Sequence, residues 1–114
     1  MISKFYIRVI KHSHMAGEKT NLIERVRNDV REPDRYKVIM HNDDFTTMEF
    51  VVKVLRSVFR HSESESQHLM LKIHEEGRAV VGIYSLDIAV TKVRKVTSMA
   101  LRENYPLKVT YEKE

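Results

Sequence analysis

The sequence predicts an α+β fold: a small β-α-α-β-α-β sandwich in which a three-stranded antiparallel sheet is covered on one face by three helices. Three observations lead to this prediction. The chain has 114 residues, which is close to the commonest size of a single domain. It contains three short stretches rich in β-forming residues. It also contains three longer stretches whose apolar residues recur at helical spacing, and elements of these lengths can bury one core as two packed layers.

The three predicted strands differ in their patterns. YKVIMH, residues 36–41, is short and rich in β-formers, and it ends at the turn-forming NDD. AVVGIYS, residues 79–85, is apolar and β-branched, and its Gly82 indicates a bulge or the close approach of another backbone. LKVTYEK, residues 107–113, alternates apolar and polar residues with a period of two, which is typical of a half-buried strand.

The first two predicted helices have recognisable start signals. Thr46 stands three residues before Glu49, a spacing that allows each side chain to accept from the other's backbone N–H in a capping box. Ser62 and Glu65 repeat this arrangement before the second helix. Gly77 then provides a left-handed end for that helix. The first helix carries its apolar face on Met48, Val51, Val52, Leu55, Val58 and Phe59.

The third predicted helix opens at Ser85 and Asp87, residue types that favour helix starts. It ends near Asn104, and Pro106 prevents its continuation. Its apolar stripe consists of Ala89, Val93, Val96 and Ala100.

The segment before the first strand differs in composition from the rest. Residues 1–35 are charged and, after Ile10, low in large apolar residues, so we predict a mobile N-terminal tail, followed by a folded domain at 36–114. HSHM at 12–15 is similar to the remnant of a cloning junction, which suggests the hypothesis that residues 1–14 are not native.

Composition excludes several classes of function. The chain has no cysteine, so it has no disulfide, no thiolate nucleophile and no Cys-based metal site. No apolar run approaches the roughly 18 residues needed to span a bilayer, which predicts a soluble protein, and the absence of cysteine favours the cytoplasm. The tail carries 8 Lys and Arg against 5 Asp and Glu, whereas residues 36–114 carry 12 against 11. The nearly neutral domain therefore does not predict nucleic-acid binding.

Polar residues gather between the first predicted strand and helix, in HNDDFTTMEFV. His41, Asp43, Asp44 and the more distant His74 are metal-ligand types, but they match neither a calcium loop nor a helical zinc pair. The chain also lacks a nucleophile motif and a glycine loop for phosphate. We therefore expect no metal, no cofactor and no catalytic residue. Two interpretations without a ligand also remain open. NDD can be an ordinary turn, and His74 can be a histidine whose positive charge complements the negative end of a helix dipole.

A third interpretation of this region is a mouth for a ligand with a charged end and an apolar end. Carboxylates, an Asn oxygen and a neutral imidazole are hydrogen-bond acceptors. A protonated α-amino group donates up to three hydrogen bonds, so it matches such a set. Apolar residues of the first and second helices, Met48, Met70 and Ile73, then suit the side chain attached to that amine.

Four stretches together resemble the ClpS adaptors, which deliver proteins bearing N-end-rule degrons to AAA+ unfoldases of the ClpA or ClpC class. They are YKVIMHNDDFTTMEFVVKVL, LMLKIHEEGRAVVGIY, DIAVTKV and YPLKVTYEKE. The match runs in order from Tyr36 to the C-terminus. The resemblance implies the same β-α-α-β-α-β fold, and it implies an adaptor rather than an enzyme.

The resemblance also implies the role of particular residues. The α-amino group of the degron's first residue is expected to bind Asn42, Asp43, Asp44 and His74, of which Asp43 ranks last. The first side chain, from Leu, Phe, Tyr or Trp, is expected to enter a pocket lined by Thr46, Met48, Val51, Met70, Ile73 and Leu107. The unfoldase's N-terminal domain is expected to dock on Asp87, Thr91 and Lys92. The tail is expected to take part in handing over the substrate.

The chain departs from the family pattern at three positions. Thr47 stands where proline is usual, Phe45 where tyrosine is common, and Val90 where the residue is often acidic. Two rival functions of other classes also remain: a protein-interaction module that acts through the third helix without degron recognition, and a small metal-dependent enzyme.

Overall fold

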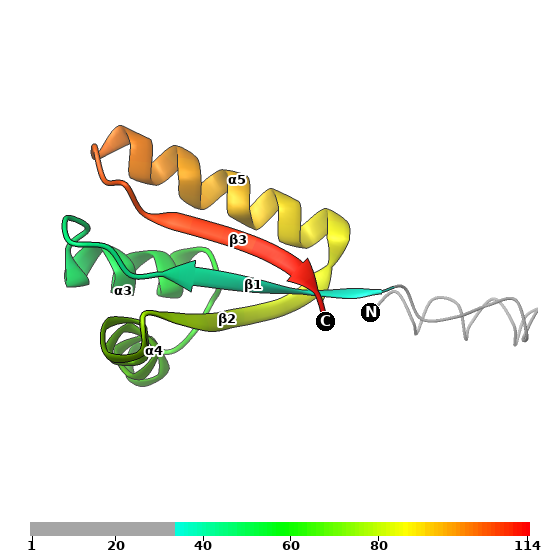
Figure 1. The fold of residues 1–114 in the computed structure, drawn as a ribbon, viewed down its shortest axis with the longest axis horizontal. Coiled ribbons are helices and arrows are strands. Elements are labelled where there is room, and N and C mark those ends of the chain that lie inside the picture. The colour runs from blue at the N-terminus through cyan, green and yellow to red at the C-terminus, as the bar shows by residue number, and fades with distance from the viewer. Residues whose placement is uncertain (1–33) are drawn as a thin grey trace, which may run out of the picture. The chain divides into compact units, whose positions relative to one another are not determined.

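Three strands and three helices follow one another in the order β-α-α-β-α-β (Figure 1). The computed structural model describes residues 34–114, so the predicted tail lies outside it except for its last two residues. The elements, labelled as in Figure 1, are β1 (Arg35–His41), α3 (Met48–Ser57), α4 (Glu63–Glu76), β2 (Arg78–Ser85), α5 (Leu86–Arg102) and β3 (Lys108–Lys113). The predicted fold class is confirmed.

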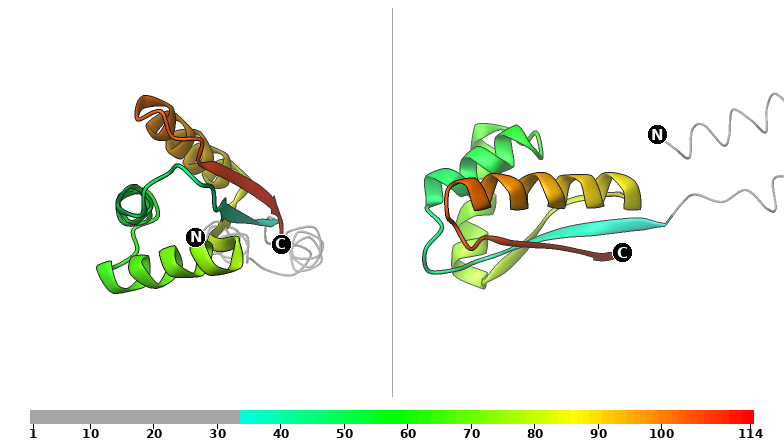
Figure 2. Two further views of the ribbon diagram at one scale, coloured as in Figure 1. Left: turned by 60° about the vertical axis from the view of Figure 1, so that its left-hand side comes forward. Right: turned by 90° about the horizontal axis from the view of Figure 1, so that it is seen from above.

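The sheet has the order β2-β1-β3, and both pairs are antiparallel. In the central strand, Val38 and Met40 are fully buried in the core. Successive side chains of a strand point to opposite faces, so Ile39 points away from that core, between Val80 and Thr110 in register. Figure 2 shows that the three helices lie on one side of the sheet, so within residues 34–114 no helix covers its other face.

The three helices differ in the strands and helices that they contact. α5 contacts all three strands, whereas α4 contacts β2 and α3. α3 contributes its buried side to the same core through Phe50, Val51, Val54 and Leu55. The ring of Phe50 also packs against Tyr105, with centroids 4.9 Å apart, which fixes the start of α3 against the turn between α5 and β3.

The start of α3 differs from the prediction by one residue. Thr47, not Thr46, is the N-cap, and its hydroxyl oxygen accepts from the backbone N–H of Phe50 at 3.1 Å. Thr46 instead donates its hydroxyl to Asp43 at 2.7 Å. The predicted capping box of Thr46 with Glu49 is therefore wrong, because two adjacent threonines offered alternative frames and Asp43 occupies the first of them.

The signals for α4 are confirmed. The Ser62 hydroxyl oxygen accepts from the backbone N–H of Glu65 at 3.1 Å, and Gly77 ends the helix at φ 91°. This left-handed conformation suits glycine because it has no Cβ. Ser85 does precede α5 as predicted, but its hydroxyl makes no capping bond and is buried without a partner among the described residues.

Of the two features inferred for Gly82, the bulge is present, whereas the group that comes close is a side chain and not another backbone. The register shifts between Val38 and Ile39, so Val81 has no opposite residue and forms a bulge in β2. The ring Nε2 of His61 donates to the freed carbonyl of Val81 at 2.6 Å. A Cβ on Gly82 would overlap the hydroxyl end of the Tyr84 side chain, so a larger residue here would displace the tyrosine ring.

The ends of the sheet bring the two ends of the described chain together. β1 begins one residue earlier than predicted, because Glu114 donates its backbone N–H to the Arg35 carbonyl at 2.8 Å. The Arg35 guanidinium also bonds the Glu114 carboxylate at 2.9 Å. No helix in residues 34–114 combines the length and the apolar character that crossing a bilayer requires.

Candidate functional site

A hollow of about 480 Å³ lies where β1 ends, between the loop that follows it and the last turns of α4. The loop and the start of α3 form one wall, and α4 forms the other. Its lining residues are Asn42, Asp43, Asp44, Phe45, Thr46, Thr47, Met48, Glu49, Val51, Met70, Ile73 and His74. All four predicted amine-binding residues and five of the six predicted pocket residues are therefore brought together.

One backbone hydrogen bond holds the two walls in place. The N–H of Asn42 donates to the carbonyl of Gly77 at 2.8 Å. Gly77 is the left-handed cap of α4, and His74 lies in the last turn of that helix. This bond therefore places the beginning of the acidic loop beside the histidine, although 32 residues of sequence separate Asn42 from His74.

The rim of the hollow is polar, exposed and unpartnered. The side chains of Asn42, Asp44 and His74 are exposed. None of the three makes a hydrogen bond or ion pair with another residue of the described range 34–114. Their oxygen and nitrogen acceptors are thus available to a donor that approaches from solvent.

The floor is apolar and belongs to the main core. Val51, Met70 and Ile73 are 7%, 8% and 2% exposed. Met48, at the first position of α3, is 45% exposed and lies at the edge of the same hollow. Polar acceptors therefore stand above an apolar base, so the site can bind a cationic group and an adjoining apolar group together.

Asp43 has a different role from its neighbours. Its Oδ1 accepts from the backbone N–H groups of Phe45 and Thr46 at 2.8 and 2.7 Å, and its Oδ2 accepts from the Thr46 hydroxyl. Burial tends to raise the pKa of this carboxyl, but the bonds from Thr46 and Phe45 outweigh it, and the pKa is lowered. Asp43 shapes the turn that presents Asp44.

We expect Asp43→Ala to lower the free energy of unfolding by about 1–3 kcal/mol, because two N–H groups and a hydroxyl lose a charged acceptor. Asp43→Asn should cost less, since its amide oxygen can still accept from both N–H groups. Urea denaturation of the two variants measures this order. Equal stabilities of the wild type and the alanine variant would contradict the structural role.

The lowered pKa of Asp43 also predicts a dependence on pH. A carboxyl whose pKa is depressed by folding stabilises the protein above its unfolded pKa, near 3.8. That contribution is lost as the pH falls through the lower, folded pKa. The stability difference between the wild type and Asp43→Asn should therefore be constant from neutral pH to about pH 5 and shrink in more acidic solution. A stability difference between these two proteins that grew as the pH fell would contradict the lowered pKa of Asp43.

The lining of the hollow differs from the predicted set in two ways. Leu107, predicted to line it, does not; it is 7% exposed and packs in the core just before β3. Phe45, Thr47 and Glu49 line it but were not predicted. The sequence did carry a signal for Phe45, because it is a large aromatic residue in a polar loop, and in the structure it is 75% exposed.

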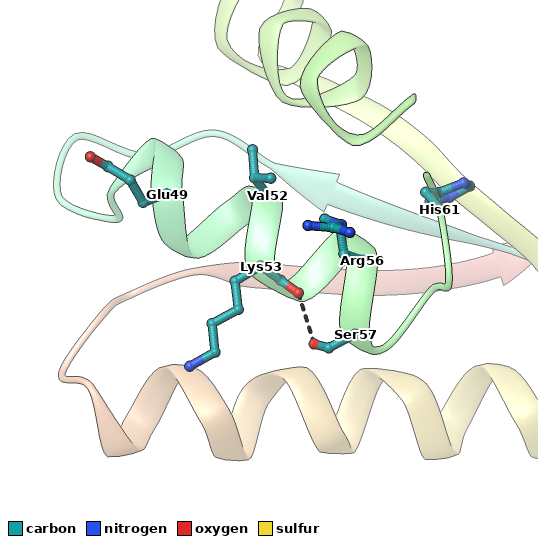
Figure 3. Close-up of a pocket in the computed structure, with 6 residues that line it drawn as sticks. All are labelled: Glu49, Val52, Lys53, Arg56, Ser57 and His61. Atoms are coloured by element: carbon teal, nitrogen blue, oxygen red, sulfur yellow. Dashed lines mark hydrogen bonds between the residues drawn. The ribbon is translucent and has the colours of Figure 1, made fainter. Parts of the chain in front are cut away.

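A second hollow, of about 470 Å³, runs along the outer side of α3 (Figure 3). Its polar groups are largely satisfied: Arg56 pairs with Glu63 at 3.1 Å, and Ser57 donates to the Lys53 carbonyl at 2.8 Å. Figure 3 shows Val52 and Lys53 pointing to opposite sides of the helix. Because these side chains diverge, this hollow is a poorer candidate site than the first.

The three predicted docking residues lie on α5 but differ in availability. Asp87 is exposed in the first turn, and the exposed Thr91 donates its hydroxyl to the Asp87 carbonyl at 2.9 Å. Lys92 turns toward the body of the domain. Its ammonium donates to the carbonyl of Val58, the C-cap of α3, at 2.7 Å and lies 5.1 Å from the ring centroid of Tyr84. Burial, with the charges of two nearby cations, lowers the pKa of Lys92.

We expect Lys92→Ala to lower the free energy of unfolding by about 1–2 kcal/mol, because the end of α3 loses a charged donor and the ring of Tyr84 loses a cation. Lys95→Ala is the matched control, since Lys95 is exposed on the same helix. It should change stability by less than about 0.5 kcal/mol. Thermal and urea unfolding measure both, and equal effects would contradict the contact with α3.

Within residues 34–114, no group of three His, Asp or Glu side chains is arranged to hold a metal ion. The fold and the first hollow together define a small α+β domain with a pocket that is acidic at its rim and apolar at its base.

Comparison with known proteins agrees with this class. The family model described as "ATP-dependent Clp protease adaptor protein ClpS" matches residues 31–110. An adapter protein ClpS from Nitratidesulfovibrio vulgaris is 46% identical over 96 residues, which cover 84% of this chain and 94% of the relative. One from Leptospira biflexa is 50% identical over 91 residues, 80% of each chain. The chain belongs to the ClpS family of adaptors of the ATP-dependent Clp protease.

A solved structure gives the fold and a ligand for comparison. It is Agrobacterium tumefaciens ClpS2 bound to L-phenylalaninamide, with a TM-score of 0.70 and 42% identity. The similarity covers 73% of this chain and 100% of that one.

Proposed function

We propose that this adaptor binds the free first residue of N-degron proteins, with Leu, Phe, Tyr or Trp as that residue, and delivers them to a Clp AAA+ unfoldase of the ClpA or ClpC class. The observation that carries the proposal is the unpartnered rim of Asn42, Asp44 and His74 above a buried apolar floor. L-phenylalaninamide, bound by the relative, supports it. This ligand has a free amine, an apolar side chain and an amide, as the first residue of a peptide does.

Binding in such a site has two parts. Burying the first side chain over Val51, Met70 and Ile73 contributes about 1.5–3 kcal/mol, and each hydrogen bond to the charged amine contributes about 1.5–3 kcal/mol. Association costs about 4–15 kcal/mol in lost freedom of motion, so tight binding requires both parts together. A side chain without a free amine, or an amine on a small side chain, is therefore expected to bind poorly.

Fluorescence anisotropy with two labelled peptides tests this proposal. The peptides differ only in their first residue, Phe in one and Ser in the other. We expect the Phe peptide to bind at least tenfold more tightly, because one buried aromatic side chain is worth about 1.5–3 kcal/mol. Equal affinities would remove degron recognition from the function of this chain.

Docking on the unfoldase is proposed to use the exposed start of α5, at Asp87 and Thr91. A pull-down with the isolated N-terminal domains of ClpA and ClpC identifies the partner class. The rival interaction module predicts that Asp87→Ala abolishes all partner binding, while Asp44→Ala has no effect on any peptide. Our proposal predicts the reverse for peptides, with Asp44→Ala weakening their binding and Asp87→Ala leaving it unchanged.

A further inference from the structure

Two cationic side chains and a histidine form one row across the sheet, on the face opposite the three helices. His41 ends β1, with Arg78 opposite it on β2 and Lys108 opposite it on β3. His41 points away from the core, because its neighbour Met40 points into the core. Its ring Nε2 also bonds the Thr110 hydroxyl at 2.9 Å, which places both on this face. We call Arg78, His41 and Lys108 the basic row.

The charge of the basic row is not balanced within the described part of the chain. Neighbouring cations of the sheet do have partners there: Lys37 pairs with Glu112 and Lys113 with Asp34. No ion pair among residues 34–114 involves the basic row. Partial burial lowers the pKa of His41, and the charges of Lys108 and Arg78 lower it further, so the fields of both cations converge at the ring.

The basic row lies next to the amine end of the pocket. His41 is followed directly by Asn42, and Arg78 is preceded directly by Gly77, the two residues joined by the 2.8 Å backbone bond. Consecutive Cα atoms are about 3.8 Å apart, and an extended peptide advances by about 3.3–3.6 Å per residue. A peptide whose first residue occupies the pocket can therefore reach the basic row with its third to sixth residues.

The side chains that line the pocket and those of the basic row carry charges of opposite sign. Asp43, Asp44 and Glu49 line the pocket itself, so they repel a carboxylate that directly follows the first residue. Beyond them, the basic row attracts one. We propose that the basic row is a subsite for the carboxylate of an Asp or Glu at the third to sixth position of the bound chain. This inference rests on the proposed function.

An acid scan tests this subsite. Peptides that begin with Phe carry a single Asp at each position from two to seven, and each is matched by a peptide with Asn at the same place. Anisotropy at low ionic strength gives the ratio of the two affinities. The full-length chain is used as wild type, as Arg78→Gln/Lys108→Gln, and as the control Arg94→Gln/Lys95→Gln, which removes the same charges from exposed positions of α5.

With the wild type and the control, Asp at one or more of positions three to six should bind about 3- to 10-fold more tightly than Asn, a range set by two exposed charge pairs. The Arg78/Lys108 variant should lose this preference and keep its affinity for the neutral Asn peptides. A wild type without any preference for Asp, or an equal loss in both variants, would overturn the subsite. If the neutral peptides fail to bind the wild type, the proposed function fails, and the subsite falls with it.

Discussion

Asp44→Ala is expected to weaken the binding of a Phe-initiated peptide about 10- to 150-fold, because a hydrogen bond between charged groups is worth about 1.5–3 kcal/mol. The carboxylate is exposed at the rim, and it has no partner within residues 34–114. Its removal should therefore change ligand binding and leave the free energy of unfolding nearly unaltered. This combination separates Asp44 from Asp43, whose loss is expected to destabilise the turn.

The matched control for Asp44→Ala is Glu75→Ala. Glu75 is an exposed carboxylate on α4, but it does not line the pocket. Anisotropy titrations of both variants with the same peptide distinguish a direct contact from a general effect of net charge. Equal affinities for the two variants would contradict a contact between Asp44 and the amine.

Met48→Ala is expected to change which first residues are accepted. Met48 lines the hollow at the start of α3, and we expect it to lie beside the Cβ of a bound first residue. A β-branched side chain is stiff and wide at this point, so the wild type should reject Ile and Val. The alanine variant should bind Ile- and Val-initiated peptides about tenfold more tightly than the wild type does, since relieving a clash of this kind is worth about 1–3 kcal/mol.

Peptides that begin with Phe or Leu are the control for Met48→Ala. Affinity for Phe and Leu peptides should stay within about threefold of the wild type, because their Cβ atoms are unbranched and the apolar floor is unchanged. A parallel variant, Leu71→Ala, removes an exposed apolar residue of α4 that does not line the hollow. If the Met48 variant still rejects Ile and Val as the wild type does, Met48 is not the residue that restricts entry.

The order of the elements could be predicted because each signal was local. Alternation in LKVTYEK predicted a half-buried strand, and Ser62 and Gly77 marked both ends of α4. The cap of α3 was misplaced because Thr46 and Thr47 are both good caps. In the structure the Thr46 hydroxyl bonds Asp43, so Thr47 caps the helix, and this contact depends on where Asp43 lies in three dimensions.

The site could be predicted where polar hydrogen-bond acceptors follow one another in a single loop, as they do from Asn42 to Asp44. It was less predictable where a role depends on contacts between distant elements. Leu107 packs in the core instead of lining the hollow, and Lys92 bonds a carbonyl 34 residues away. The basic row also depends on strand register, which pairs His41 with residues of two other strands.

An NMR titration of the full-length, ¹⁵N-labelled chain with L-phenylalaninamide tests the central claim, that the rim and floor together bind a free first residue. We predict shift changes concentrated at Asn42, Asp44, Met48 and His74, and none with N-acetyl-L-phenylalaninamide, which has the same side chain but no cationic amine. Equal changes with both ligands, or changes confined to α5, would contradict the account.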